Sequence, residues 1–472
     1  MFELLSAIDG FVWGPAMIAL LLGSHVFLTF RLGFIQRRLP QAIRLSWKKD
    51  KGAEGDISNF GALSTALAAT IGTGSIVGVA TAIIAGGPGA VFWMWIAGIF
   101  GIATKYAEVF VSLKYRVKDH NEEMLGGAMY AWERAFKKDG KTPIWAKVMA
   151  VLFAVFAAVA AIGTGSAVQA SAMTGIITSN VDVPAWVIGI IIVVMSGAVI
   201  LGGVKKISTV CERLVPVMAV GYAAGCIIIL CMNWQYLLPA LWEILRCAFT
   251  SRAAFGGAVG SGVVVALQFG CARGLFSNES GLGSAPIIAA AAQTRNPAQQ
   301  ALVAMTGAFW STVVICLLTG IVLVSTMLAY PEIQEMILAN PTLFTGAQLS
   351  SIAFSKIPVI GTPILVLGMV AFSYSTILGW SYYGSRCATY LFGHRAVRPY
   401  QVIYVLISFL GAIGVGDVVW LVSDIGNAFM AIPNIIVTLA LSGLVARETK
   451  HYVYDGHLDD ECLDDIPKVY TK

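Results

Sequence analysis

The chain has 472 residues, of which 57% are hydrophobic and only 12% are charged, and its mean hydropathy is +0.78. Because a soluble domain carries about 25% charged residues, this composition excludes a soluble enzyme. The formal net charge of +5 fits a basic face on one side of a membrane and indicates no nucleic-acid partner.

The predicted elements are transmembrane helices placed on the apolar runs of the sequence. Each run is about as long as, or longer than, the roughly 20 residues that a helix needs to cross a bilayer. The sequence predicts an all-α polytopic membrane protein with about eleven transmembrane helices, and it lacks the alternating segments of a transmembrane β-barrel. The eight cysteines form no Cys-x-x-Cys pair, so neither a disulfide framework nor a resident metal or other cofactor is expected. The expected spans cover residues 11–31, 59–86, 89–113, 145–178, 184–204, 208–232, 256–291, 298–329, 358–385, 399–416 and 418–446.

Lys and Arg residues indicate the orientation of the spans, because they accumulate in cytoplasmic loops. With the N-terminus outside and the C-terminus in the cytoplasm, most of the 31 Lys and Arg residues lie in inside segments. Two of these segments, Gln36–Lys51 and Ala128–Lys138, are amphipathic and suit the headgroup plane of an anionic leaflet. Ordinary juxtamembrane loops explain them equally well. The acidic tail at 447–472 is expected to be a solvated cytoplasmic end.

Two predicted spans contain glycines and polar residues at membrane depth. In the second span, Gly72 and Gly74 alternate with Thr73 and Ser75. In the seventh span, VALQFGCARGLFSNESGLGSAP, glycines and charged residues extend over 270–283. Unwound backbone in a bilayer must be satisfied by protein or by a water-filled cavity. Both spans are therefore predicted to be discontinuous, and a central cavity is implied.

The two broken spans predict an internal repeat. Five spans lie between the start of one and the start of the other, so that they cross the membrane in opposite senses. Glycine-interrupted helices at corresponding positions of two halves are typical of secondary transporters with inverted repeats. The predicted organisation is an extra N-terminal helix with a basic amphipathic segment (1–58), a first repeat (59–255), a second repeat (256–446) and the cytoplasmic acidic tail (447–472).

The break in the second span offers a site for two ions, because one half-helix ends with free carbonyls and the next begins with free amides. A substrate carboxylate would lie against the amides from Gly74 onward, with Ser75 or Thr73 as the N-cap. A monovalent cation would use the carbonyls from Ala68 to Ile71. Alternatively, the GTGS sequence is only a surface for close helix packing.

Polar side chains in two other spans are candidates to complete the site. Gln169 lies deep in the fourth span, where a hydrogen bond to a neighbouring helix is the simpler explanation. In the ninth span, Ser375 and Thr376 offer oxygen ligands for Na⁺, and Trp380 shares a face with Thr376 and suits the wall of an apolar pocket. The alternative is that the hydroxyls bond to their own helix and the indole packs in the bundle. A second GTGS at 163–166 does not match the repeat and is expected to supply packing glycines.

Arg273 and Glu279 are charged residues inside the seventh span, so they are expected to face protein or water. They either satisfy the unwound backbone or act as a gate, and neither is expected to bind the substrate. A channel would need a repeated filter motif or a ring of charge, which the sequence lacks. An intramembrane enzyme would need a nucleophile with a base or a metal cluster, yet of five His residues just His25 lies well inside a span.

Four stretches of the chain resemble the alanine or glycine:cation symporters of bacteria and archaea, within the amino acid–polyamine–organocation group. They are GTGSIVGVATAIIAGGPGAVFWMW, GLFSNESGLGSAP, STILGWSYYG and DVVWLVSDIGNAFMAIPN, in the family's order within residues 59–446. The resemblance implies a five-plus-five inverted repeat after one extra helix. It also implies symport of Na⁺, sometimes H⁺, with a small neutral amino acid such as alanine or glycine across the bacterial inner membrane.

Matching motifs imply roles for single residues. The resemblance implies that the substrate is bound by Thr73, Gly74, Ser75, Gln169 and Trp380. Ser375 and Thr376 match positions expected to help hold Na⁺, beside the carbonyls of Ala68 and Ile71 proposed above. The family usually has Asn where this chain has Ser75 and Ser171. Both replacements shorten a side chain near the proposed pocket, so a larger neutral amino acid such as glutamine is the alternative substrate.

Overall fold

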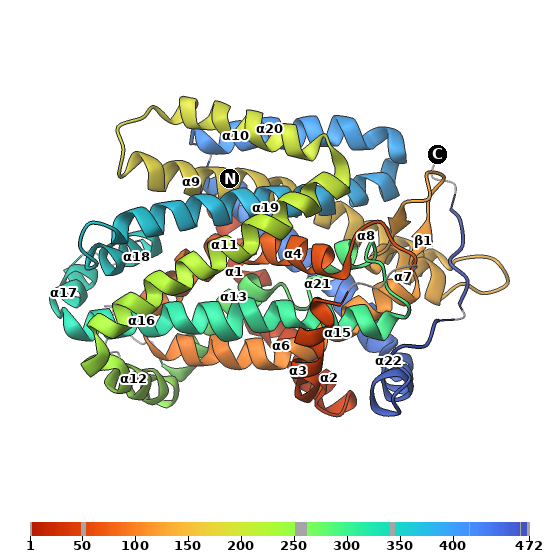
Figure 1. Ribbon diagram of the computed structural model, residues 1–472, viewed down its shortest axis with the longest axis horizontal. Coiled ribbons are helices and arrows are strands. Elements are labelled where there is room, and N and C mark those ends of the chain that lie inside the picture. Colours follow the sequence, from red (N-terminus) through yellow and green to blue (C-terminus); the bar gives the residue numbers. More distant parts are fainter. Residues whose placement is uncertain are drawn as a thin grey trace.

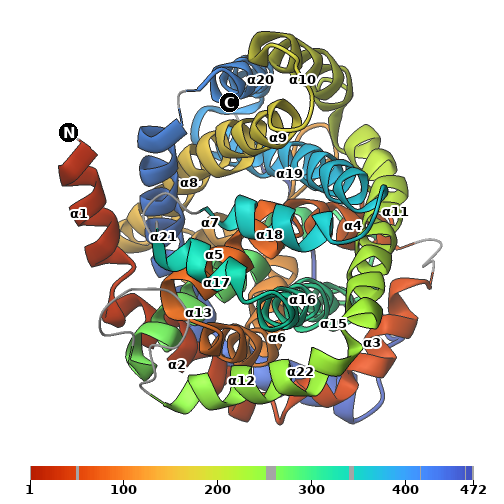
Figure 2. The same ribbon diagram turned by 90° about the vertical axis from the view of Figure 1, so that its left-hand side faces the viewer.

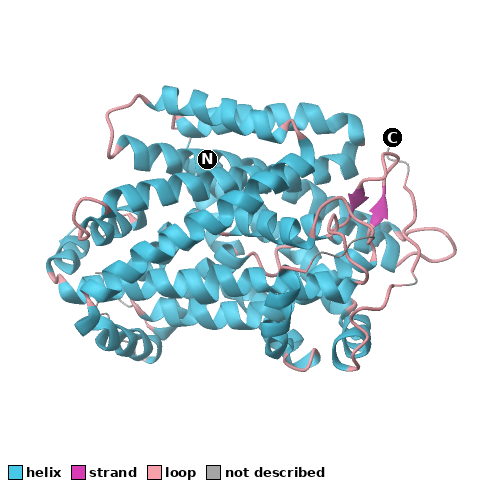
Figure 3. Ribbon diagram, viewed as in Figure 1, coloured by secondary structure: helices cyan, strands magenta, loops and turns pink. Residues whose placement is uncertain are grey.

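The computed structural model describes residues 2–48, 53–250, 262–339, 345–414, 416–462 and 464–469. Within these residues almost every ordered element is a helix, as predicted, and the two strands form one small hairpin (Figure 3). Its strands β1 (Val117–Lys118) and β2 (Met124–Leu125) are antiparallel, with Val117 opposite Leu125 and Lys118 opposite Met124.

Long helices run side by side along the molecule (Figure 1). In the described part of the chain, seven helical stretches are long and apolar enough to cross a membrane, and each falls on a predicted span. The other predicted spans are shorter or interrupted helices, so the count of eleven crossings and the inverted repeat stay predictions. The predicted boundary between the repeats, at 255–256, lies outside the described residues.

The helices of the seven stretches are α1 (Phe2–Val12), α2 (Pro15–Arg31), α6 (Gly89–Lys114), α8 (Ile144–Ala160), α9 (Val168–Thr178), α11 (Gly203–Met232), α15 (Pro297–Ala308), α16 (Leu317–Ala329), α19 (Gly361–Phe392) and α21 (Gly416–Ala440). A new helix begins at Pro15 because proline lacks an amide to continue α1 but suits a first turn. The π-helical segments η3 (Ala161–Ala167) and η5 (Phe309–Cys316) join α8 to α9 and α15 to α16. Such segments are frequent at functional sites.

Shorter helices cover one edge and the two ends of the bundle. Helices α10 (Ala185–Ile200) and α20 (Val397–Ala412) pack together along the edge at the top of Figures 1 and 2. One end carries η4 (Trp234–Tyr236), α12 (Leu237–Phe249), α17 (Glu332–Ala339) and α18 (Gly346–Ser355). The segments that the charge bias predicts to be cytoplasmic include η1 (Ile35–Arg38), α3 (Leu39–Ser46), α7 (Ala128–Ala135), η6 (His394–Ala396), α22 (Ser442–Thr449) and η7 (Lys450–Tyr454). Helices α3 and α7 lie in the two segments predicted to be amphipathic. Residues 49–51, at the end of the first of these segments, lie outside the described residues.

The second span is interrupted at the predicted place. Helix α4 (Asn59–Thr70) is followed by the 3₁₀ turn η2 (Thr73–Ser75) and then by α5 (Val77–Gly86). The helix stops because the amide of Gly72 donates to the carbonyl of Thr70 instead of the carbonyl of Ala68. The carbonyl end of α4 and the amide end of α5 therefore face one gap.

The seventh span is interrupted later than predicted. Helix α13 (Val263–Asn278) continues through Gly270 and Gly274, and the break lies between Asn278 and the start of α14 (Ala285–Ala289). The region near 270–283 where the break is predicted therefore contains most of it, but the backbone unwinds only after Asn278. Gly270 is required by packing instead, because a Cβ there would lie 2.3 Å from the carbonyl oxygen of Ala90 on α6.

Candidate functional site

The two breaks share a small buried cavity in the middle of the bundle. Its lining residues come from α4, η2, η3, α9, α13, α19 and α21 and include both sides of the second break. They are Ala69, Thr70, Gly72, Gly74, Thr164, Gln169, Phe276, Glu279, Leu282, Thr376, Trp380 and Asn427. The cavity encloses about 10 Å³, which is close to the space that one water molecule needs. An amino acid therefore fits there only after the walls move apart.

Oxygen atoms converge at the carbonyl end of α4. Thr376 Oγ1 and Ser375 Oγ lie 3.0 and 3.2 Å from the carbonyl oxygen of Ala68. Each hydroxyl is also 2.9 Å from the carbonyl oxygen of Phe372 on its own helix, so the bonding to their own helix that we gave as the alternative is present as well. Because hydroxyl hydrogens rotate, both hydroxyls can instead turn their lone pairs toward a cation. The carbonyl of Ile71 has no hydrogen-bond donor among the described residues.

Glycines bring α19 and α4 into this contact. A Cβ at Gly72 would lie 2.6 Å from Thr376 Oγ1, and a Cβ at Gly379 would lie 3.0 Å from the amide nitrogen of Ala69. Side chains at these positions would push the hydroxyls away from the carbonyl end of α4. The glycine signal of the second span thus serves close approach as well as unwinding.

The amide end of the gap has no side-chain cap. Among the described residues, the backbone amides of Thr73 and Gly74 have no hydrogen-bond acceptor. The N-cap of α5 is Ile76, without a side-chain hydrogen bond, so the prediction that Ser75 or Thr73 caps this helix is wrong. Ser75 Oγ instead lies 3.0 Å from Ser277 Oγ on α13. Of the three predicted substrate residues here, only Gly74 lines the central cavity.

Two buried amide side chains present unpaired oxygens near this gap. Gln169 Nε2 donates to the carbonyl of Thr164 at 3.1 Å, and Asn427 Nδ2 donates to Thr164 Oγ1 at 2.8 Å. Gln169 Oε1 and Asn427 Oδ1 are buried without a partner among the described residues. Because an unsatisfied buried acceptor costs about 1–3 kcal/mol, this arrangement favours a ligand that donates hydrogen bonds.

Sequence reasoning missed Thr164 and Asn427. The 163–166 copy of GTGS does supply packing glycines, since a Cβ at Gly165 would lie 2.2 Å from the Cβ of Trp380. Thr164, between the two glycines, lines the cavity. The π-helical turn that contains it could not be predicted from the motif, and Asn427 stood in a quoted motif without being singled out.

Charged side chains fill the second break. Lys105 Nζ lies 3.1 Å from Glu108 Oε1 and donates to the carbonyl of Glu279 at 2.8 Å. Glu108 Oε2 accepts from the amide of Gly281 at 3.1 Å and from Asn434 Nδ2 at 2.8 Å. Residues of α6 and α21 thus satisfy the unwound backbone. Sequence reasoning had considered only Arg273 and Glu279 for this purpose.

The carboxylate of Glu279 lines the central cavity. It accepts a hydrogen bond from Ser284 Oγ at 2.5 Å and lines the cavity together with Trp380. Glu108 and Glu279 together face a single basic side chain, Lys105, so among the described residues the cluster has one acidic group more than it has basic groups. A buried carboxylate without a basic partner is costly unless a cation or a proton is supplied.

A larger cavity of about 760 Å³ lies between the central cavity and the α18 end of the molecule. Gly74 and Phe276 line both cavities and therefore separate them. Thr73, Ser171 and Arg273 line only the larger one. Figure 2 views the molecule from this end, with α18 over its centre. The arrangement indicates a route to the central cavity whose inner boundary is the Phe276 side chain.

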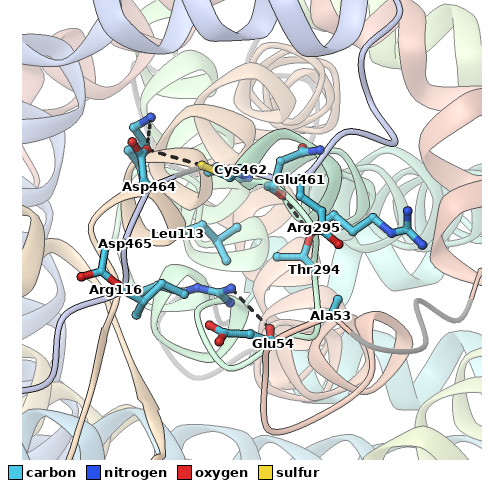
Figure 4. Close-up of a pocket in the computed structure, with 14 residues that line it drawn as sticks. Ala53, Glu54, Leu113, Arg116, Thr294, Arg295, Glu461, Cys462, Asp464 and Asp465 are labelled. Atoms are coloured by element: carbon cyan, nitrogen blue, oxygen red, sulfur yellow. Dashed lines mark hydrogen bonds and ion pairs between the residues drawn. The ribbon is translucent and has the colours of Figure 1, made fainter.

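A polar recess of about 430 Å³ lies at the opposite end, under the C-terminal segment (Figure 4). Lys114 pairs with Glu448 at 2.6 Å and with Asp464, and the hydrogen-bonded ammonium holds the pKa of Asp464 below its usual range. The amide of Cys462 donates to the carbonyl of Arg295 at 2.9 Å. The acidic tail is therefore docked on the protein, which the sequence does not predict, and it lies apart from the central cavity.

Comparisons with known proteins agree with this geometry. The model of the sodium:alanine symporter family matches residues 1–461. The sodium/alanine symporter AgcS of Methanococcus maripaludis is 46% identical over 95% of this chain and 97% of its own length. The probable sodium/glutamine symporter GlnT of Bacillus subtilis is 33% identical over 93% of this chain and 88% of its own. The crystal structure of MhsT with L-phenylalanine has the same fold, with a TM-score of 0.57 at 16% identity, over 85% of this chain and 95% of MhsT.

Proposed function

The chain belongs to the sodium:alanine symporter family, and from this premise we propose that it carries a small neutral amino acid, such as alanine or glycine, together with Na⁺ by alternating access around the central cavity. The family supports Na⁺-coupled amino acid symport by a multi-pass membrane protein and no enzymatic activity. The observation that carries the finer proposal is the gap between α4 and α5, where free carbonyls and free amides face one another beside unpaired acceptors.

Na⁺ is proposed to bind at the carbonyl end of this gap. Its ligands would be the carbonyl oxygens of Ala68 and Ile71 and the hydroxyls of Ser375 and Thr376. Na⁺ is a hard cation, for which carbonyl and hydroxyl oxygens are suitable ligands. Binding would replace the hydrogen bonds that now join the hydroxyls to Ala68, and would therefore hold α19 against α4.

The amino acid is proposed to bind across the gap as a zwitterion. Its carboxylate would lie against the amides of Thr73 and Gly74 at the start of η2, which leads into the positive end of α5. Its ammonium would donate to Gln169 Oε1, Asn427 Oδ1 and the carboxylate of Glu279. The ammonium would satisfy the two unpaired acceptors and supply a second cationic group beside the two acidic side chains that share Lys105. This assigns a substrate role to Glu279 that we had not expected from sequence.

The walls favour a small side chain. Trp380 and Phe276 line a cavity that holds little more than a water molecule, so each added methylene requires further movement of the walls. One methylene changes binding by about 1–3 kcal/mol, enough to separate glycine and alanine from larger amino acids. Glutamine is the second candidate, because GlnT is named for it and because Ser171, where the family usually has the longer Asn, lines the larger cavity.

The proposed setting is the bacterial inner membrane, with the N-terminus outside and the C-terminus in the cytoplasm. The 760 Å³ cavity then opens to the outside and the recess of Figure 4 faces the cytoplasm. With one Na⁺ per neutral amino acid, each cycle moves one positive charge inward, which is worth about 2.3 kcal/mol per 100 mV.

Uptake of labelled alanine into proteoliposomes tests the proposal. Saturable uptake that requires an inward Na⁺ gradient is expected, and competition by glycine should exceed competition by glutamine. Uptake driven equally well by a proton gradient without Na⁺ would make H⁺ the coupling ion. Uptake that needs neither ion gradient and does not saturate would indicate a channel and contradict symport.

A further inference from the structure

Three potential metal ligands that the transport mechanism does not use meet on the side predicted to be cytoplasmic. Asp119 and Glu123 belong to the turn between β1 and β2, and His394 begins η6 after α19. One ligand atom from each lies within 4.8 Å of the other two. The side chain of Asp119 is fully buried, whereas those of Glu123 and His394 are 36% and 39% exposed, so solvent reaches the cluster from one side.

Two of these ligand atoms are unpaired. Asp119 Oδ1 accepts from the amides of Asn121 and Glu123, at 2.8 and 2.9 Å, which fixes the carboxylate. Its other oxygen, Oδ2, is buried and has no hydrogen-bond partner among the described residues, and the same is true of His394 Nδ1. The two atoms are 3.8 Å apart, too far for a direct hydrogen bond. Two ligands of one tetrahedral zinc ion lie roughly 3.4 Å apart, so a small movement would suffice.

The surroundings select the kind of ion. Arg386 Nη1 pairs with Glu123 Oε2 at 2.6 Å and neutralises part of the charge of the cluster. A hard cation such as Ca²⁺ prefers six or more oxygen ligands, which this site does not offer. A carboxylate with an imidazole is typical of zinc and related transition metals. The ring of His120 lies 5.5 Å from the ring of His394, centroid to centroid, and offers a further imidazole.

We propose that Asp119, Glu123 and His394 bind a divalent transition-metal ion such as Zn²⁺, which clamps the β1–β2 turn to the end of α19. The turn continues α6, which packs against α13 and α15, whereas α19 packs against α11, α8 and α9. The ion therefore joins two sets of helices on one face of the protein. Because alternating access requires such sets to move against each other, bound zinc would slow transport; this consequence rests on the proposed function, whereas the binding does not.

Zinc titration of the purified full-length protein, with a competing fluorescent chelator, tests the site without transport. One zinc ion per chain is expected for the wild type, and His394→Gln and Asp119→Asn should each weaken binding at least about tenfold. His457→Gln is the control for the other group of potential metal ligands among the described residues, the exposed His451, His457 and Asp460. Zinc binding equal to that of the wild type is expected for this variant if the ion lies at Asp119, Glu123 and His394. Size-exclusion profiles identical to the wild type would show that each variant is folded.

No binding by the wild type, or equal binding by the wild type and both site variants, would overturn the proposal, and a simple Asp119–His394 ion pair would then be the better explanation. In proteoliposomes, zinc should slow Na⁺-dependent alanine uptake by the wild type and by His457→Gln but not by His394→Gln. Equal inhibition of all three would exclude the clamp even if zinc binds. Failure of uptake altogether, with zinc binding intact, would count against the proposed function alone.

Discussion

The two broken helices differ in what satisfies their unwound backbone. In the gap between α4 and α5, the carbonyl of Ala68 meets only neutral hydroxyls, and the amides of Thr73 and Gly74 have no acceptor among the described residues. In the gap between α13 and α14, Lys105 and Glu108 bind the backbone directly. One break is open to a ligand, and the other is closed by the protein's own charges.

This difference indicates that the two breaks have different roles. Unpaired backbone groups at membrane depth cost several kcal/mol each, so the first break is stable only when ions or water replace the missing partners. The second break carries its partners with it and offers Glu279 to the shared cavity. The first break should therefore control ligand affinity, whereas the second should control stability.

Lys105→Met should have the largest effect. It leaves Glu108 and Glu279 buried without their cation, and removing one member of a buried ion pair destabilises by about 3–5 kcal/mol. We expect a strongly lowered melting temperature in detergent, measured by fluorescence-detected size-exclusion chromatography. Lys147→Met, which removes an exposed lysine of α8, is the control. A double variant with Glu108→Gln should recover part of the loss, and a single variant that melts like the wild type would show that the second break does not depend on charge.

Thr376→Val should impair Na⁺ binding with little effect on stability. The substitution keeps the shape of the side chain and removes a ligand at the carbonyl end of α4. Because a hydrogen bond or ligand to a charged group contributes about 1.5–3 kcal/mol, the Na⁺ concentration for half-maximal uptake should rise by about tenfold or more. Thr389→Val is the matched control, since Thr389 is also buried on α19 and its hydroxyl, among the described residues, bonds only to the carbonyl of Ser385 on the same helix. An unchanged Na⁺ titration would remove Thr376 from the ion site.

Gln169→Leu should weaken binding of the amino acid more than binding of Na⁺. It removes one acceptor proposed for the ammonium, while Asn427 and Glu279 remain, so we expect a rise of roughly tenfold or less in the KM for alanine. Gln401→Leu, a buried glutamine of α20 that bonds to Ile200, controls for loss of a helix–helix contact. Equal effects of the two variants on KM would make Gln169 a packing residue.

The sequence predicts these features unequally. Apolar runs and glycines sufficed to locate both breaks, and the hydroxyl pair at Ser375 and Thr376 was correctly expected to lie beside the carbonyl end of α4. The partners of the second break could not be predicted, because Lys105 and Glu108 are far from Glu279 in sequence. In addition, a Lys and a Glu three residues apart in one helix are an ordinary charged pair that does not indicate a distant partner. Nor does a glycine show whether it unwinds a helix, as at Gly72, or admits a neighbour, as at Gly270.

Ser75→Ala should have the smallest effect, and it distinguishes a role of Ser75 in substrate binding from a role in packing. The motif suggests a substrate ligand, whereas the hydroxyl bonds to Ser277, and Ser277 also contacts Cys316. Loss of one neutral buried hydrogen bond costs about 1 kcal/mol, so the melting temperature should fall slightly and the KM for alanine should stay within about threefold of the wild type. A much larger rise in KM, with the melting temperature unchanged, would mean that Ser75 turns into the cavity when the amino acid binds. The bond between the two breaks would then be part of the transport cycle rather than a fixed contact.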